Sequence, residues 1–447
     1  RQILLMATTQ RLTADHIKAL MATFWTWTFD LYDLFILSLI APYIAELFFA
    51  HMPYAVALAA TMAAYFTSFI VRPIGAITFS PLGDKIGRKK VITYGVIGLV
   101  IFETSQAALP TAAQVGILAP ILLILLRLGL GYFVGAIVGG SHLIGPESVP
   151  ERHRGWVGGF GFSAAGMAYL IASAWFLLSV YVAPGPAYLE YGWRIMFLGG
   201  LLPLIILFYV NYIVPESPIY TGLKRAGQVT KTPVKDFFSR RSGLLKLFII
   251  ALLVTVSWGG LYYVTIGLYP TFLAVINKLP KPEIGTIMLL SSVAMIIGPT
   301  LGGEISQHIG RRLMSIIGSI IVIPLSFLYL HLGSLPPSAF SIILAETVLI
   351  ALLADFGGGI LMTYLNEVYP GRVRSTGVSF TWNTGFAIGA ASAIVGIPTL
   401  TAIYGIKTFP IWETTIMIIL AIIGLIAMIF SPETRGNIEK ERQALGM

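Results

Sequence analysis

Two aspartates, Asp30 and Asp33, lie inside an apolar segment near the start of this 447-residue chain. Because they are three residues apart, a helix would place both carboxyl groups near one face. Two carboxylates this close cannot both be ionised at low cost in free energy, so we expect one of them to hold a proton at the working pH. A group that gains and loses a proton in this way is what a proton carrier requires.

A basic partner for these acids is Arg127, which lies within the apolar segment Leu126-Arg127-Leu128-Gly129. The glycines around it allow another helix to approach closely. We therefore predict that Asp33 first, and Asp30 second, form a proton-coupling group with Arg127. A static ion pair that only fixes helix packing is the alternative.

The composition indicates what kind of element holds these charges. Residues of the hydrophobic set make up 56% of the chain and charged residues 11%, whereas about 25% of the residues in a soluble domain are charged. The apolar runs are about 20 residues or longer, as spanning helices require, and lack the strict alternation of barrel strands. We therefore expect an all-α membrane protein, in which a buried charge costs about 2.5–3.5 kcal/mol and is a functional candidate by default.

Twelve spans are predicted, and their first and last residues follow from where each apolar run begins and ends. The predicted spans are 17–49, 54–81, 91–110, 113–146, 155–182, 193–213, 244–276, 283–307, 312–332, 337–368, 373–400 and 408–430.

Basic residues gather in the even-numbered connections between these spans, while the odd-numbered ones hold only Arg194, Lys278, Lys281 and Lys407. Basic loops favour the cytoplasmic side, so we predict a multi-pass protein of the cell membrane with both termini in the cytoplasm. A nucleic-acid surface, the other interpretation of a net charge of +9, would need these residues on one soluble face. The predicted organisation is an N-terminal half (1–214), a cytoplasmic linker (215–243), a C-terminal half (244–431) and a cytoplasmic tail (432–447).

Three short motifs recur in the two halves at nearly constant separation. The pattern E-x-x-P-x-R-x-R begins at Glu147 and again at Glu367, 220 positions later, and Gly87-Arg88-Lys89 recurs as Gly310-Arg311-Arg312, 223 positions later. Pro215-Glu216-Ser217 recurs as Pro432-Glu433-Thr434, 217 positions later. Two parallel six-helix repeats around a central site are used by transporters that alternate access by rocking.

At these motifs the chain resembles the major facilitator superfamily, and in particular its sugar-porter and metabolite–proton symporter branches, which include symporters of sialate, carboxylates and phosphate. The segment 80–90 is similar to the family's G-x-x-x-D-[RK]-x-G-R-[RK] loop, with Ser80 in place of the first glycine. In the second half Gly303 is present, but Gln307 replaces the aspartate. The resemblance implies twelve transmembrane helices in two pseudo-symmetric six-helix halves, the major facilitator fold.

The charges of these loops predict a cytoplasmic gate. We expect Asp84 to lie against a helix N-terminus of the other half, where free N–H groups favour an anion. Charge-assisted contacts would join a cluster in each half. The predicted gate residues are Arg88, Glu147 and Arg154 with Asp84 in the first half, and Arg312, Glu367 and Arg374 in the second. Solvated loop charges that only set the topology are the alternative.

The resemblance also implies a solute site. In sugar porters a Tyr-Asp of the first helix and an Arg of the fourth form a proton-linked pair, and Tyr32-Asp33 and Arg127 match those positions. The glycine-flanked tyrosine pair of span 7 is similar to that of sugar porters, but the amides that usually precede it are absent. The predicted solute-binding residues are Arg127, Tyr32, Ser163, Trp258, Tyr262, Tyr263, Tyr364, Trp382, Asn383 and Asp355. Lipid contact is the alternative for each aromatic residue.

Other ionisable residues of the spans are expected to have structural roles. Glu46, Glu103, Glu346 and Glu413 are predicted at interfaces or in packing, His142 in packing, and Arg72 near the cytoplasmic third of its span. The chain has no cysteine, and its histidines form no ligand-spaced pair, so we expect no metal, no cofactor and no enzyme activity.

The predicted function is secondary active transport, namely proton-coupled symport of a small organic solute, either an organic acid or a sugar. A phosphate–proton symporter and a drug/proton antiporter of the same fold are alternatives, and a non-transporting membrane receptor is the alternative class. The expected partners are the solute, protons and the lipid bilayer, with no nucleic acid, and we expect a monomer.

Overall fold

The fold is helical throughout the part of the chain that the computed structural model describes, residues 11–229, 231, 233–239 and 243–445, and these residues form no strand. Eleven of its helices are long and apolar enough to cross a membrane, and a bent pair adds a twelfth span. The predicted number of spans and the all-α class are therefore confirmed.

The first six spans form the N-terminal half. They consist of α2 (Ala14–Phe48), α3 (Tyr54–Ile86), α4 (Arg88–Ser105) with η1 (Gln106–Ala108), α6 (Leu118–Ser148), α7 (Glu151–Phe162) with α8 (Ala164–Val182), and the segments η2 (Tyr188–Gly192), α9 (Trp193–Leu198), η3 (Gly199–Leu201) and α10 (Leu204–Tyr212). The short helix α5 (Ala112–Val115) precedes α6, and α11 (Pro218–Arg225) and α12 (Pro233–Phe238) follow α10.

The last six spans form the C-terminal half. They consist of α13 (Leu244–Tyr262) with η5 (Tyr263–Gly267) and α14 (Tyr269–Val275), α15 (Lys281–Ile309), α16 (Arg311–Ser326) with α17 (Leu328–Ser334), α18 (Phe340–Leu353) with η7 (Gly357–Ile360) and α19 (Leu361–Val368), α20 (Arg374–Ala390) with η8 (Ala391–Gly396) and α21 (Ile397–Tyr404), and α22 (Phe409–Phe430). Helix α23 (Asn437–Ala444) follows the last span.

The first span is bent by 53° between Leu37 and Leu39. Pro42 lies one turn beyond this break. Because proline has no N–H to donate to the carbonyl four residues earlier, and its ring crowds that carbonyl, the helix kinks at this point. The kink follows the segment of α2 that carries Asp30 and Asp33.

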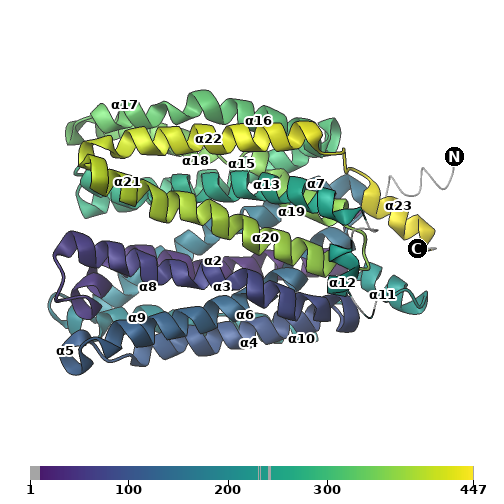
Figure 1. The fold of residues 1–447 in the computed structure, drawn as a ribbon, viewed down its shortest axis with the longest axis horizontal. Coiled ribbons are helices and arrows are strands. Elements are labelled where there is room, and N and C mark those ends of the chain that lie inside the picture. Colours follow the sequence, from purple (N-terminus) through teal and green to yellow (C-terminus); the bar gives the residue numbers. More distant parts are fainter. Residues whose placement is uncertain (1–10, 230, 232, 240–242, 446–447) are drawn as a thin grey trace.

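The two halves lie side by side, with their helices roughly parallel (Figure 1). Helices α7 and α8 of the first half pack against α15 of the second, and α3 packs against α20. Helices α11, α12 and α23 lie at one end of the bundle, and α5, α17 and α21 lie at the other (Figure 1). The charged loop motifs share the end with α11, α12 and α23, which is the predicted cytoplasmic end.

The repeated motifs fold into the same turn in both halves. Gly87 and Gly310 connect consecutive spans with φ of 107° and 98°, a left-handed region that favours glycine. Glu216 accepts a hydrogen bond from the N–H of Arg88 at 3.0 Å, and Glu433 accepts one from the N–H of Arg311 at the same distance. Each glutamate therefore caps the first turn of the helix that follows the glycine.

Candidate functional site

An ion pair between α2 and α6 lies inside the N-terminal half. The Arg127 guanidinium donates to both carboxylate oxygens of Asp33, one of them at 3.1 Å, and to the Ser68 hydroxyl at 3.2 Å. The Arg127 side chain is fully buried, and that of Asp33 is 2% exposed. The structure thus brings together the two residues that the sequence placed first, in the bidentate geometry that makes arginine–carboxylate pairs strong.

Asp30 has a different partner. Its carboxylate is 3.4 Å from a guanidinium nitrogen of Arg72 on α3, whose guanidinium carbon lies 4.4 Å from the centre of the Phe69 ring. The prediction that Asp30 shares Arg127 is therefore wrong. Three residues turn a helix by about 300°, so the two side chains diverge by about 60° and reach different neighbouring helices.

A third acid, Glu103 on α4, completes this network. Its carboxylate lies 4.0 Å from Arg127 and accepts a hydrogen bond from Gln106 at 3.0 Å. Glu103 was predicted to lie at an interface or to serve in packing, whereas the residue is 1% exposed and belongs to the Arg127 network. The glutamate directly after the apolar run Leu99-Val100-Ile101-Phe102 was the available signal. Three buried carboxyl groups therefore accompany two guanidinium groups, Arg72 and Arg127.

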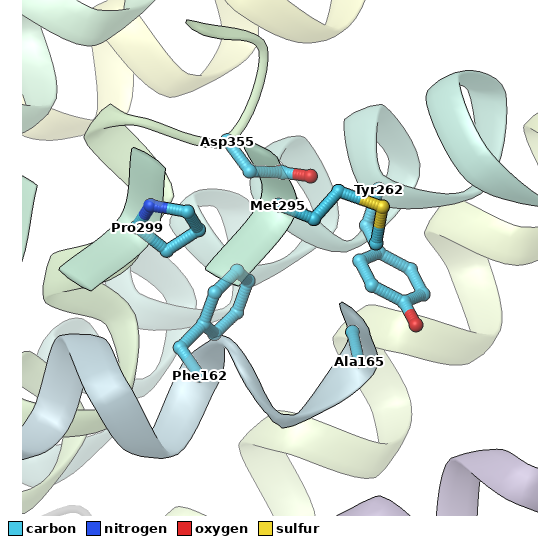
Figure 2. A pocket seen from close by; sticks show the side chains of 6 residues that line it. All are labelled: Phe162, Ala165, Tyr262, Met295, Pro299 and Asp355. Carbon is cyan, nitrogen blue, oxygen red and sulfur yellow. The ribbon is translucent and has the colours of Figure 1, made fainter. Parts of the chain in front are cut away.

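A small cavity lies where the two halves meet. It has a volume of about 10 Å³, room for about one water molecule, and is lined by Phe162, Ala165, Tyr262, Met295, Pro299 and Asp355. Ligand pockets in proteins usually enclose about 300–1,000 Å³, so this cavity is smaller than an open solute site. Figure 2 shows the Asp355 carboxyl group and the Tyr262 and Phe162 rings around the same space. Asp355 and Tyr262 are the two predicted solute residues that line it.

Two further aromatic residues of the predicted solute site are buried in the protein, not exposed to lipid. Tyr263 packs edge-on against Phe69 of the other half at 5.4 Å. Trp382 packs against His142 at 4.2 Å and Trp27 at 5.2 Å, in a cluster that joins α20 to α6 and α2. These residues contribute to the contact between the halves next to the cavity.

The remaining predicted solute residues form hydrogen bonds within the protein and do not line this cavity. Trp258 donates to Ser315 at 3.0 Å, and a Cβ added at Gly357 would lie 2.5 Å from its ring. The other hydrogen bonds join Tyr364 to Ser431, Asn383 to Ser379 and Gly135, Ser163 to Phe160, and Tyr32 to Met196. Their residue types matched a solute site, but their helix rotation directs them elsewhere.

The charged cluster predicted to form the cytoplasmic gate begins at Asp84. Its carboxylate accepts hydrogen bonds from the backbone N–H groups of Ser375 at 3.0 Å and Thr376 at 2.9 Å, and from the Thr376 hydroxyl at 2.8 Å. These N–H groups belong to the first turn of α20, where a helix has no internal acceptors for them. Asp84 thus lies against a helix N-terminus of the other half, as the sequence predicts.

Glu147 connects Arg88, which pairs with Asp84, to the C-terminal half. Arg88 lies 3.0 Å from Asp84 and 3.4 Å from Glu147, and Arg374 of the C-terminal half donates to Glu147 at 3.0 Å. Ser217 also donates to Glu147. All three side chains of this ion-pair chain, Arg88, Glu147 and Arg374, are at most 2% exposed, so the predicted first-half cluster gains a cation from the second half.

Three of the predicted gate contacts are wrong, the first because Arg374 pairs with Glu147 and not with Glu367. Arg154 does not contact Glu147 but donates to the carbonyl oxygens of Pro146 at 3.1 Å and Val149 at 3.2 Å. Glu367 pairs with Arg311 at 3.1 Å, whereas Arg312 donates to the carbonyl oxygens of Met428 and Ile429 at the end of α22. Arg311 is the residue 223 positions after Arg88, so the repeat spacing itself indicates the residue that pairs.

The gate also holds α23. Glu441 of this helix accepts hydrogen bonds from the Arg374 guanidinium and, at 2.7 Å, from the backbone N–H of Gly371. Glu439 lies 3.9 Å from Arg154. Helix α23 after the last span is therefore a third component of this charged cluster, a contact that was not predicted from the sequence.

Buried charges inside apolar helices, a central cavity between two halves, and a charged closure at one end together define a membrane transport protein. The chain matches the family model described as Sugar (and other) transporter over residues 18–228, and that of the Major Facilitator Superfamily over residues 262–445. The chain belongs to the major facilitator superfamily, and it is a secondary transporter.

Known proteins are similar along nearly the whole chain. A putative metabolite transport protein of Haemophilus influenzae is 30% identical, with 83% of each chain covered. The proline/betaine transporter of Salmonella typhimurium is 24% identical, covering 90% of this chain and 81% of the relative. Among solved structures, that of the proton:xylose symporter XylE bound to 6-bromo-6-deoxy-D-glucose has a TM-score of 0.76 at 15% identity, covering 97% of this chain and 99% of the other, and shows the shared fold.

Proposed function

We propose that this chain is a proton-coupled symporter that moves a small organic solute inward by alternating access. The observation that supports the proposal most is the buried pair of Asp33 and Arg127 with Glu103 beside it. Ionised groups are costly inside a membrane-spanning bundle and persist there when they serve an ion or proton pathway. With three carboxyl groups and two guanidinium groups in this region, electroneutrality is reached when one acid carries a proton.

Protonation changes what holds α2 and α6 together. A proton on Asp33 removes its negative charge, so the charge-assisted hydrogen bonds from Arg127 become weaker neutral ones. Glu103 then accepts more of the Arg127 charge. The two helices exchange one strong contact for weaker ones, and α6 becomes freer to move relative to α2.

The same helix connects this site to the cytoplasmic gate. Arg127 and Glu147 both lie on α6, 20 residues apart, which corresponds to about 30 Å along the helix. A rigid displacement of α6 at Arg127 therefore moves Glu147 relative to Arg374 on the other half. Opening of the gate exposes the central cavity to the cytoplasm, and both the solute and the proton leave there.

The class of solute remains a small organic molecule. The sequence predicts either an organic acid or a sugar as the solute. An organic acid could bind Arg127 only after Asp33 is protonated, because Asp33 otherwise occupies that guanidinium, whereas a sugar has no such requirement. The names of the relatives include metabolites, proline and betaine, which agree with a small polar solute. Phosphate symport, drug antiport and a receptor role are the alternatives, and we further propose a monomer in the cell membrane with both ends in the cytoplasm.

The test uses purified protein in liposomes with a pH-sensitive dye inside and a panel of solutes outside. We expect one solute class to drive internal acidification in the wild type, and Asp33→Asn to abolish it. Asp15→Asn is the matched control, since Asp15 is exposed and pairs only with Lys18 among the described residues. If the wild type acidifies for no solute, the receptor alternative replaces the proposal. If Asp33→Asn acidifies like the wild type, the proposed coupling site is wrong.

A further inference from the structure

Among the described residues that line the central cavity, Asp355 is the one acid. It follows α18, at the break before η7, and its side chain is directed into the cavity beside Met295 (Figure 2). The residue is 5% exposed, and none of the described residues forms a hydrogen bond or an ion pair with its carboxyl group. A buried carboxyl group without a partner is costly, so this position needs an explanation other than packing.

The cations nearest to the centre are already paired. Arg127 is engaged by both oxygens of Asp33 and by Ser68, and Arg72 lies against Asp30 and the Phe69 ring. A solute whose only charge is negative would find no free guanidinium among the described residues that line the cavity, and it would be repelled by an ionised Asp355. A solute with a positive charge would supply the partner that Asp355 lacks.

The rest of the lining favours the same kind of group. Phe162 and Tyr262 present aromatic rings to the space that Asp355 enters (Figure 2). A cation near an aromatic face gains about 0.5–2 kcal/mol, and a cationic nitrogen bound between rings and a carboxylate is a recurrent form of ammonium recognition.

We infer that the central cavity binds a solute through a positively charged nitrogen, with Asp355 as its counter-charge and Phe162 and Tyr262 around it. This inference rests on the proposed transport function and names the solute class, an amine or quaternary ammonium compound. The nitrogen belongs either to a simple cation or to a zwitterion that also has a carboxylate, and the test separates these two sources.

The experiment measures binding to the full-length protein in detergent by calorimetry, so it needs no proton gradient. The probes are shape-matched pairs in which carbon replaces the charged nitrogen. Choline is compared with 3,3-dimethyl-1-butanol, and glycine betaine with 3,3-dimethylbutanoate, and xylose and succinate serve as the neutral and the anionic solute. We expect at least one nitrogen-bearing probe to bind about tenfold or more tightly than its carbon counterpart, and choline against betaine shows whether a carboxylate is tolerated.

Two variants test the residue itself. Asp355→Asn keeps the shape and removes the charge, and we expect it to weaken binding of the nitrogen-bearing probe at least about tenfold. Glu413→Gln is the matched control, because Glu413 is also a buried acid without a partner among the described residues but does not line the cavity. We expect this variant to bind the nitrogen-bearing probe within about twofold of the wild type. If Asp355→Asn does not fold, the comparison of the paired probes on the wild type decides alone.

Three results would overturn the inference. In the first, both members of each probe pair bind the wild type with equal affinity. In the second, Asp355→Asn binds the nitrogen-bearing probe as tightly as the wild type does. In the third, only xylose or succinate binds. If any of these results is observed but solute-driven proton uptake still requires Asp33, the inference fails and the proposed symport stands. Binding that depends on Asp355 without any proton uptake would instead remove the symport and leave the solute class.

Discussion

Replacing Asp84 with asparagine is expected to open the predicted cytoplasmic gate. Asp84 accepts three hydrogen bonds from the first turn of α20, at 2.8–3.0 Å, across the boundary between the halves. Hydrogen bonds to a charged group contribute about 1.5–3 kcal/mol, and neutral ones about 0.5–1.5 kcal/mol. Asparagine keeps one acceptor oxygen, and its amide nitrogen cannot accept a hydrogen bond. A loss of at least about 1 kcal/mol for each of the three bonds lowers the stability of the closed state by about 3 kcal/mol or more, which is a shift of about 100-fold or more in the equilibrium between closed and open gates.

The absence of native cysteine provides a clean assay for this shift. Ser379 lies one turn deeper in α20 than Ser375 and is fully buried, so Ser379→Cys introduces a single thiol behind the closed gate. We expect a maleimide reagent to label this thiol tens of times faster, or more, when Asp84→Asn is added. The rate reports the fraction of open gates as long as opening and closing are faster than labelling.

The control for this measurement is Asp15→Asn in the same Ser379→Cys background, because it removes an exposed aspartate at the same end of the molecule. Equal labelling rates for Asp84→Asn and Asp15→Asn would show that Asp84 does not hold the halves together. The reasoning would also fail if Asp84→Asn lowered the unfolding temperature so far that labelling followed unfolding, and a melting curve of each variant tests this.

Three more outcomes are expected. Glu147→Gln should speed labelling of the same thiol at least several-fold more than Glu367→Gln, because the former carboxylate pairs with a guanidinium of the other half and the latter with one of its own half. Glu103→Gln should shift the pH at which proton uptake is half-maximal without abolishing uptake, as a pH series in liposomes shows. Gly359→Ala should lower the melting temperature by several degrees, since the added Cβ would lie 2.0 Å from a backbone oxygen of α15. Gly285→Ala is the control, because a Cβ there meets nothing within 4 Å, and the melting temperature should be unchanged or slightly higher.

The sequence was sufficient for features that depend on run length and on local motifs. Twelve apolar runs predicted twelve spans because a bilayer accepts little other than a helix of this length. Asp84 was correctly placed at a helix N-terminus because the free N–H groups of any first turn attract an anion. The repeat spacing also contained the answer for the second half, where Arg311 and not Arg312 corresponds to Arg88.

Side-chain direction inside the bundle could not be predicted in the same way. Whether Asp30 reaches Arg127 or Arg72 depends on the rotation of α2 relative to α3 and α6, and a difference of about 60° between two positions decides it. The depth of Glu103 depends on where α4 ends, and span boundaries carry the largest error of any sequence prediction. Residues such as Trp258 and Asn383 have the chemistry of a solute site but satisfy their hydrogen bonds within the protein.

The two halves form equivalent contacts with unequal charge, and we expect this difference to decide which contact holds the predicted gate closed. Gln307, 223 positions after Asp84, accepts a hydrogen bond from the N–H of Gly155 near the start of α7 at 3.0 Å, just as Asp84 accepts from α20. The amide of Gln307 is neutral, so this contact lacks the attraction between an anion and the positive end of the helix. It is also independent of pH, whereas the aspartate contact is weakened when its carboxylate is neutralised. The closed state therefore depends more on the α3–α20 side than on the α15–α7 side, and we expect the halves to separate first where the neutral contact lies.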